Sequence, residues 1–245
     1  MTPLRTLALM AHPDDAEFLC AGTLIRLAEA GCEVHIATLA AGDWGTVSET
    51  AEAIGKRRKG EAAEAAALIG ATYHCLDECD GLVVYDKSTI HKCIDICRLV
   101  APQLMFTHNP LCYMMDHVVV AQLARAASFV YGAPNASSLP LREGSRVPHL
   151  YYCDSIEGID PLGKPVVPSA FFNISEQLEK KAEMLACHRS QREWLRAHHG
   201  NDEYIDSMRR HSAHRGREAG VASAEAFVQH LGHPYPKDNI LAEFR

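Results

Sequence analysis

The chain has 245 residues, of which 47% are hydrophobic and 22% are charged, values typical of a globular protein rather than a disordered one. Its 24 basic and 31 acidic residues give a net charge of −7, which disfavours nucleic acid as a partner because proteins that bind it usually carry a basic face. No apolar run approaches the roughly 20 residues that span a bilayer, so the sequence predicts no membrane segment.

Strand-like and helix-like segments alternate along the first half of the chain. Strands are predicted at 4–10, 33–39, 71–75 and 103–107, and helices at 16–30, 51–69, 87–99 and 116–130. A loop rich in Gly, Ser and Thr at 40–50 follows the second strand. This alternation predicts an α/β fold with a doubly wound, mostly parallel, Rossmann-like sheet and helices on both faces.

The second half is less regular. Six prolines between 134 and 168 break the chain into loops around one strand-like run at 149–153. Further helices are predicted at 175–195, at 202–217 and, as a short one, near 223–231. We therefore expect a single α/β domain over 1–245, with a core at about 1–131 and an irregular, partly helical C-terminal extension at about 132–245.

The cysteines and the first residues bear on the cellular compartment. Nine cysteines are an odd number in a chain too long to need disulfides, which points to a reducing environment. The six-residue apolar run near the N-terminus stops at a polar cluster and is shorter than a secretory signal requires. The sequence predicts a cytoplasmic protein.

A polar cluster follows the first predicted strand. His12, Asp14 and Asp15 lie where the strand ends, and open parallel sheets bind ligands outside the carboxyl ends of their strands. A dinucleotide-binding fold would place a glycine-rich turn there, and none is present. Imidazole and carboxylate suit Zn²⁺, whereas a lone aspartate would more often cap a helix.

A second polar cluster follows the strand at 103–107. The loop reads THNPLCYMMDH, and Asp116 and His117 open the next helix. A catalytic zinc takes three protein ligands and a water, so a ligand from this loop would complete a site begun at the first cluster. Two clusters at the ends of two strands indicate a metal site better than either does alone.

The sequence resembles the PIG-L/LmbE-like de-N-acetylases, zinc hydrolases that remove N-acetyl groups from glucosamine-containing compounds. The stretch AHPDDAEFLCAGTL at 11–24 and the Asp116-His117 pair carry this resemblance, which extends from about residue 5 to about residue 230. Weaker matches are Gly42-Asp43-Trp44-Gly45, Arg58-Lys59-Gly60-Glu61, Lys181, His188-Arg189-Ser190-Gln191, and Gly216 to Gly220 leading into AEAF at 224–227.

The resemblance implies one Zn²⁺ per chain, held by His12, Asp15 and His117, with Asp116 supporting the ligands. It makes Asp14 the general base. Zinc lowers the pKa of a bound water to about 7 and polarises an amide carbonyl, and a neighbouring carboxylate can carry the water's proton to the leaving nitrogen. The implied substrate is an N-acetylglucosamine-type sugar or glycoside. The residues themselves point only to metal-assisted amide hydrolysis, and iron or cobalt could occupy the same ligands.

The sequence departs from the family at Met114. Many relatives have His-Pro-Asp-His here, and the first histidine stabilises the oxyanion, whereas a thioether cannot donate a hydrogen bond. Loss of such a donor typically costs about 2.7–4 kcal/mol at the transition state. We therefore predict a replacement donor, from this chain or a neighbouring subunit, and favour His188. The other candidates are Tyr113, His198, His199, His211 and His214.

Three residues are candidates for contacts with the substrate. Arg58 resembles an arginine that relatives use for substrate hydroxyls or phosphate, although it could also be a surface residue paired with Glu61. Asp43 and Trp44 lie on the loop at 40–50. Trp44 could stack on a sugar ring, or it could anchor the loop in the core.

The sequence contains two rival candidate sites. Cysteines and histidines could form a second zinc site, although Cys often acts as a small buried hydrophobe, and Cys112 near the first site could merely fill space. The residues of the second site would be Cys75, Cys79, Cys93 and Cys97, with His74 and His91 nearby. Ser190 is a poor nucleophile candidate because it lies in a helical pattern and no G-x-S-x-G motif is present.

The sequence is also compatible with other functions. The chain could hydrolyse another small amide or an ester, or it could be a zinc- or sugar-binding relative without turnover, which the methionine at 114 would allow. The expected partner is a small N-acetylated sugar, with neither nucleic acid nor membrane involved. The resemblance also implies a homo-oligomer.

Overall fold

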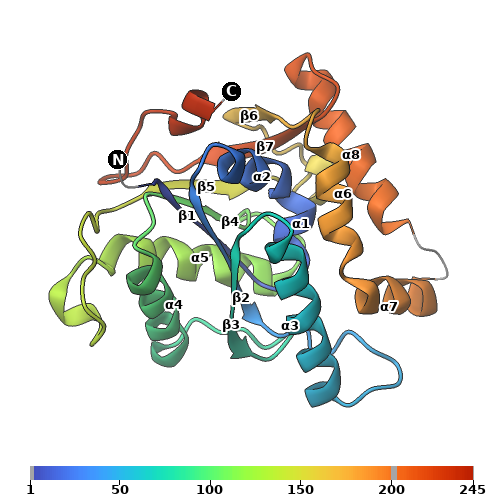
Figure 1. Cartoon of the computed structure of the whole chain (residues 1–245), viewed down its shortest axis with the longest axis horizontal. Coiled ribbons are helices and arrows are strands. Elements are labelled where there is room, and N and C mark those ends of the chain that lie inside the picture. Colours follow the sequence, from blue (N-terminus) through green and yellow to red (C-terminus); the bar gives the residue numbers. More distant parts are fainter. Residues whose placement is uncertain (1–2, 200–202, 245) are drawn as a thin grey trace.

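The computed structural model describes residues 3–199 and 203–244, without the side chains of 198 and 199. One seven-stranded sheet runs through this part of the chain, in the order β3-β2-β1-β4-β5-β7-β6 (Figure 1). The strands are β1 (Arg5–Met10), β2 (Glu33–Ala40), β3 (Thr72–Glu78), β4 (Leu104–Thr107), β5 (His149–Cys153), β6 (Ala170–Asn173) and β7 (Ala224–Gln229).

Most of the sheet is parallel. The pairs β1–β2, β1–β4, β2–β3 and β4–β5 are parallel, whereas β7 pairs antiparallel with both β5 and β6. The predicted doubly wound, mostly parallel α/β fold is therefore confirmed. The carboxyl ends of β1 to β4 meet at one edge of the sheet, which is where both polar clusters emerge.

The helices alternate with the strands through the first half and gather in the second half. They are α1 (Asp15–Leu19), α2 (Ala21–Glu29), α3 (Ala51–Ala67), α4 (Lys87–Val100), α5 (Met115–Val130), α6 (Leu178–Ala186), α7 (Arg189–His199) and α8 (Tyr204–Ala219). Short 3₁₀ helices are η1 (Pro134–Ala136), η2 (Ile156–Gly158) and η3 (Ile240–Phe244). The helix predicted at 16–30 is broken at Cys20, and the one predicted at 175–195 is broken between α6 and α7. Within the described residues no helix is long and apolar enough to cross a bilayer.

The sheet separates two hydrophobic cores. Along β1, Ala8 and Met10 face the first core, whereas Leu7 and Leu9 face the second, as the two-residue repeat of a strand requires. The first core includes side chains of α1, α2, α3, α6 and α8, and the second includes those of α4 and α5. Both faces of the parallel strands are thus covered, which fits their near-continuous apolar sequence.

The prediction of a short helix near 223–231 is wrong. The segment AEAFVQ forms β7, which is hydrogen-bonded to β5 on one side and to β6 on the other. Ala and Glu favour helices in isolation, but two strand partners override that preference. The sequence analysis also missed β6, which has only four residues. The C-terminal extension is therefore less irregular than expected, because it adds strands to the same sheet.

Glu225 of β7 caps α2 from a distant part of the chain. No side chain caps α2 from its N-cap residue Cys20. Instead, Glu225 accepts hydrogen bonds from the backbone N–H groups of Gly22 (2.8 Å) and Thr23 (2.7 Å), where a carboxylate is favoured by the unpaired donors and the helix dipole. Lys181 of α6 donates to the same carboxylate at 2.6 Å and is 1% exposed. A buried ion pair thus joins α2, α6 and β7.

Candidate metal centre and cleft

The loops after β1 and β4 bring His12, Asp15 and His117 together. One ligand atom from each of the three residues lies within 4.8 Å of the others, and no other group of His, Cys, Asp or Glu in the described residues meets this test with three members. His12 Nδ1 lies 3.4 Å from Asp15 Oδ2, and His117 Nε2 lies 3.4 Å from Asp15 Oδ1. Two imidazoles and one carboxylate are a donor set that suits zinc.

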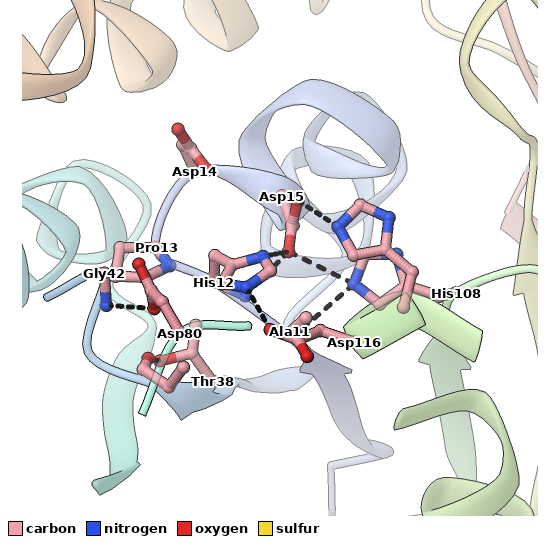
Figure 2. A network of polar contacts seen from close by, with 12 residues as sticks. Ala11, His12, Pro13, Asp14, Asp15, Thr38, Gly42, Asp80, His108 and Asp116 are labelled. Carbon is pink, nitrogen blue, oxygen red and sulfur yellow. Dashed lines mark hydrogen bonds and ion pairs between the residues drawn. The ribbon is translucent and has the colours of Figure 1, made fainter. Parts of the chain in front are cut away.

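Two neighbours fix the orientation of the histidine rings. Asp116 Oδ2 lies 3.0 Å from His12 Nε2, so the other nitrogen, Nδ1, faces Asp15 (Figure 2). Cys112 Sγ lies 3.1 Å from His117 Nδ1 and leaves Nε2 for the site. Metal-binding histidines usually donate their second N–H to such an outer partner. The geometry places Asp116 where a supporting residue would lie.

Asp116→Ala is expected to weaken zinc binding by about 10–100-fold. The reason is that the His12 ring would lose the acceptor that holds its orientation and keeps the proton on Nε2. A competition titration with a zinc-sensitive dye gives the Kd, and Asp86→Ala, which removes an exposed carboxylate outside the site, should leave it unchanged. Equal zinc affinity in Asp116→Ala and the unmodified protein would contradict this role.

The ligands lie in a negatively charged environment. Burial lowers the pKa of His12, but hydrogen bonds to Asp116 and Asp15 outweigh it and raise the value to about 10. Burial and the charge of His108 lower the pKa of His117 to about 3, so this ring is neutral. Burial opposes ionisation of Asp15, yet the surrounding histidines hold its pKa well below the usual range. A neutral imidazole, an ionised carboxylate and an excess of carboxylates fit a divalent cation.

Asp14 lies beside these ligands but is not one of them. Its backbone has a left-handed conformation (φ 101°), which is uncommon for a residue other than glycine, and Figure 2 shows its side chain pointing away from the His12 ring. Burial raises its pKa to about 6, while Arg58 and a hydrogen bond from Tyr204 lower it. Arg58 also donates to the Pro13 carbonyl at 2.7 Å and so supports this turn.

Three residues near the ligands were missed in the sequence analysis. His108, fully buried directly after β4, has its Nε2 3.1 Å from Asp15 Oδ2 and 2.9 Å from the Ala11 nitrogen. Asp80, two residues after β3, accepts a hydrogen bond from the Gly42 N–H at 2.9 Å (Figure 2). Both follow strand ends, so the rule that found His12 and His117 could have found them. No sequence pattern around Tyr204, on α8, indicates that this residue lies near the ligands.

A cleft of about 530 Å³ opens over this group. Polar residues that line it include His12, Asp14, Asp15, Asp80, His117, Tyr113, Gln191 and Tyr204. Apolar and aromatic ones include Phe18, Leu19, Trp44, Met114, Ile156, Trp194 and Leu195. The metal-ligand group therefore forms part of the wall of a ligand-sized cavity.

The structure separates the candidates for the replacement donor. Tyr113 lines the cleft, is 64% exposed and contacts the His117 ring edge-on at 5.6 Å between centroids. His188, the favoured candidate, is fully buried where α6 meets α7, with Nε2 3.5 Å from Glu17 Oε2, and is not among the residues that line the cleft.

The remaining histidine candidates lie elsewhere. His211 and His214 contact Asp154 and Glu218 respectively and line a separate hollow. The side chains of His198 and His199 are outside the described part of the chain. Among the predicted donors whose side chains the structure describes, Tyr113 is the one that lines the cleft.

The predicted substrate residues differ in their surroundings. Arg58 is 4% exposed and donates to Pro13, Asp14 and Gly42, so it is neither a surface residue nor paired with Glu61. Asp43 Oδ1 accepts the Asp80 N–H at 2.9 Å, and Asp43 is not among the residues that line the cleft. Trp44 does line it and is 56% exposed, which does not fit a buried anchor.

The structure gives no support to the rival sites. Cys93 and Cys97 are buried in the second core, and burial raises the pKa of both thiols. They form no group of three ligands with Cys75, Cys79 or the nearby histidines in the described residues. Ser190 donates its hydroxyl to Glu61 Oε2 at 2.5 Å at the start of α7, a structural role that agrees with its exclusion as a nucleophile.

Comparison with known proteins places the chain among characterised relatives. Residues 7–128 match the family model PIG-L, described as GlcNAc-PI de-N-acetylase. The chain is 24% identical over 241 residues to a 4-oxalmesaconate hydratase of Pseudomonas putida (93% of this chain, 87% of that protein). It is 26% identical over 200 residues to a diacetylchitobiose deacetylase of Thermococcus kodakarensis (76% and 70%).

A solved structure shows the same fold. The N,N'-diacetylchitobiose deacetylase of Pyrococcus horikoshii superposes with a TM-score of 0.79 at 22% identity, covering 94% of this chain and 86% of that one.

Proposed function

Since the chain belongs to the PIG-L family, we propose that it is a zinc-dependent hydrolase that removes the N-acetyl group from an N-acetylglucosamine-type sugar or glycoside. One observation carries the proposal. His12, Asp15 and His117 converge at the wall of a cleft, with the buried carboxylate of Asp14 beside them. The family supports deacetylation, and the donor set supports the metal.

The residues have two roles in this reaction, metal binding and proton transfer. His12 Nδ1, Asp15 and His117 Nε2 would hold the zinc, which supplies a Lewis acid that polarises the amide carbonyl. Asp14 takes a proton from the attacking water and returns it to the leaving nitrogen. The amide C–N bond breaks, and the products are acetate and a free amine. Tyr204 and Arg58 keep the Asp14 carboxyl in place for both transfers.

Tyr113 is the proposed substitute for the histidine that relatives have at position 114. Its phenol lines the cleft next to His117, and the ordinary pKa of a tyrosine hydroxyl is about 10. The hydroxyl therefore stays protonated at neutral pH and can donate a hydrogen bond to the oxyanion, as a methionine thioether cannot.

Hydration of an unsaturated substrate is the second candidate function. The hydratase relative matches 93% of this chain, and Asp14 could move the proton of a water molecule in that reaction too. The substrate named for that relative is an organic anion. Arg58 is the sole Lys or Arg among the described residues that line the cleft, and its guanidinium already donates to Pro13, Asp14 and Gly42. The scarcity of lysine and arginine to bind an organic anion in the cleft favours the deacetylase.

Release of primary amine from a panel of N-acetylglucosamine compounds tests the proposal. We expect release by the zinc-loaded protein and none by Asp14→Ala. The same preparations are given 4-oxalmesaconate, and loss of its ultraviolet absorbance is followed. Absorbance loss without amine release would establish the second candidate instead. Bound zinc with neither reaction would leave another small amide or ester, or a binding protein without turnover.

The cysteines bear on the cellular setting. All nine cysteines are free thiols, as in proteins of a reducing compartment, and we propose a cytoplasmic homo-oligomer that acts on a small molecule.

A further inference from the structure

We propose that the substrate carries an apolar aglycone, an aryl or alkyl group, which binds in the cleft beside the sugar. This inference rests on the proposed function and names its substrate class. It follows from the side chains that line the cleft beyond the metal-ligand group.

Aromatic side chains are concentrated at this one place. The chain has two tryptophans, and both line the cleft. Trp44 comes from the loop after β2 and Trp194 from α7. Phe18 and Leu19 lie one helical turn beyond Asp15 on α1, so the apolar wall begins directly next to the ligands. Phe18 also stacks on Tyr204, with 5.7 Å between ring centroids.

Trp44 is held at the cleft without being buried. More than half of its surface is exposed, and a Cβ placed on Gly81 would lie 2.7 Å from its ring. The close approach therefore depends on glycine at position 81, which also donates its N–H to Asp116 at 2.7 Å. A large apolar surface kept exposed next to a reactive group is typical of a binding site.

The volume and the charged residues of the cleft limit which groups can bind there. A cavity of about 530 Å³ lies in the range of roughly 300–1,000 Å³ found for drug-sized ligands, and it leaves room beside a single sugar ring. Arg58 is the only lysine or arginine among the described cleft residues; it is almost fully buried, and its terminal nitrogens donate to Pro13, Asp14 and Gly42. A phosphate or carboxylate on the aglycone would meet no exposed lysine or arginine among these residues, whereas an uncharged apolar group would meet the aromatic wall.

The test compares two glycosides that differ in the aglycone alone, methyl and phenyl N-acetyl-β-D-glucosaminide. We expect kcat/KM for the phenyl compound to be at least tenfold higher. Trp44→Ala and Trp194→Ala should each reduce that preference severalfold. Leu162→Ala, which removes an exposed apolar side chain outside the cleft, should preserve it. Equal kcat/KM for both compounds in the unmodified protein would overturn the inference and leave the deacetylase intact.

A binding measurement separates this inference from the proposed function. Because both tryptophans line the cleft, their fluorescence reports binding without turnover. If neither glycoside is deacetylated, the proposed function fails, and titration with the same phenyl and methyl N-acetyl-β-D-glucosaminides tests the apolar subsite by itself. Tenfold tighter binding of the phenyl compound would support the apolar subsite, and equal affinities would refute it.

Discussion

Asp14→Asn is expected to lower kcat for amine release by about 10²–10⁴-fold, the usual contribution of a positioned general base and acid. Asparagine has almost the same shape and tolerates the left-handed backbone at this position (φ 101°). It can still accept the hydrogen bond from Tyr204, but it cannot take a proton from water. Turnover should therefore fall while the fold and the three ligands persist.

The control for this variant is Asp77→Asn. Asp77 is also a left-handed aspartate (φ 54°), but its carboxylate pairs with Lys59 on the surface and is not among the cleft residues. Its kcat should stay within twofold of the unmodified protein. Zinc content, measured by plasma emission, should be near one per chain in both variants. More than a tenth of the original kcat in Asp14→Asn would reject Asp14 as the base.

Glu225→Ala is expected to lower the free energy of unfolding by about 3–5 kcal/mol. The change leaves the Lys181 ammonium buried without its counter-charge. It also removes the acceptor for two N–H groups at the start of α2. Since domains are stabilised by only about 5–15 kcal/mol in total, the loss should be plain in a urea titration.

Lys180→Met is the matched control for Glu225→Ala. Lys180 is next to Lys181 in the chain, but its ion pair with Glu183 is exposed to solvent. Such pairs contribute about 0–1 kcal/mol, so the unfolding midpoint should hardly move. A loss of less than 1 kcal/mol in Glu225→Ala would mean that water or another group replaces the carboxylate.

The parallel part of the fold was predictable because each of its elements carries a local signal. Buried strands alternate with amphipathic helices at regular spacing. The polar clusters at 12–15 and 116–117 follow β1 and β4, which are neighbours in the sheet. The rule that ligands bind at such ends predicts that the two clusters share one site, and the family resemblance implies His12, Asp15 and His117 as its ligands.

The parts of the fold and the site that the sequence did not predict depend on contacts between residues far apart in the chain. The segment at 224–229 reads as a helix until its strand partners are known. His188 fits a family-like stretch, but its place against Glu17 is decided by the break between α6 and α7. Tyr204 and Trp194 reach the cleft from helices whose packing no short pattern encodes. Such placements are properties of the assembled molecule.

The bond between Glu225 and the start of α2 has a consequence for biosynthesis. The two partners are separated by 203 positions in the chain. During synthesis helix α2 therefore lacks this cap until strand β7 has emerged from the ribosome. Contacts of such long range are slow to form, and the unfinished chain exposes apolar surface meanwhile. A nascent chain that stalls before residue 225 would present an unfinished first core to chaperones and proteases.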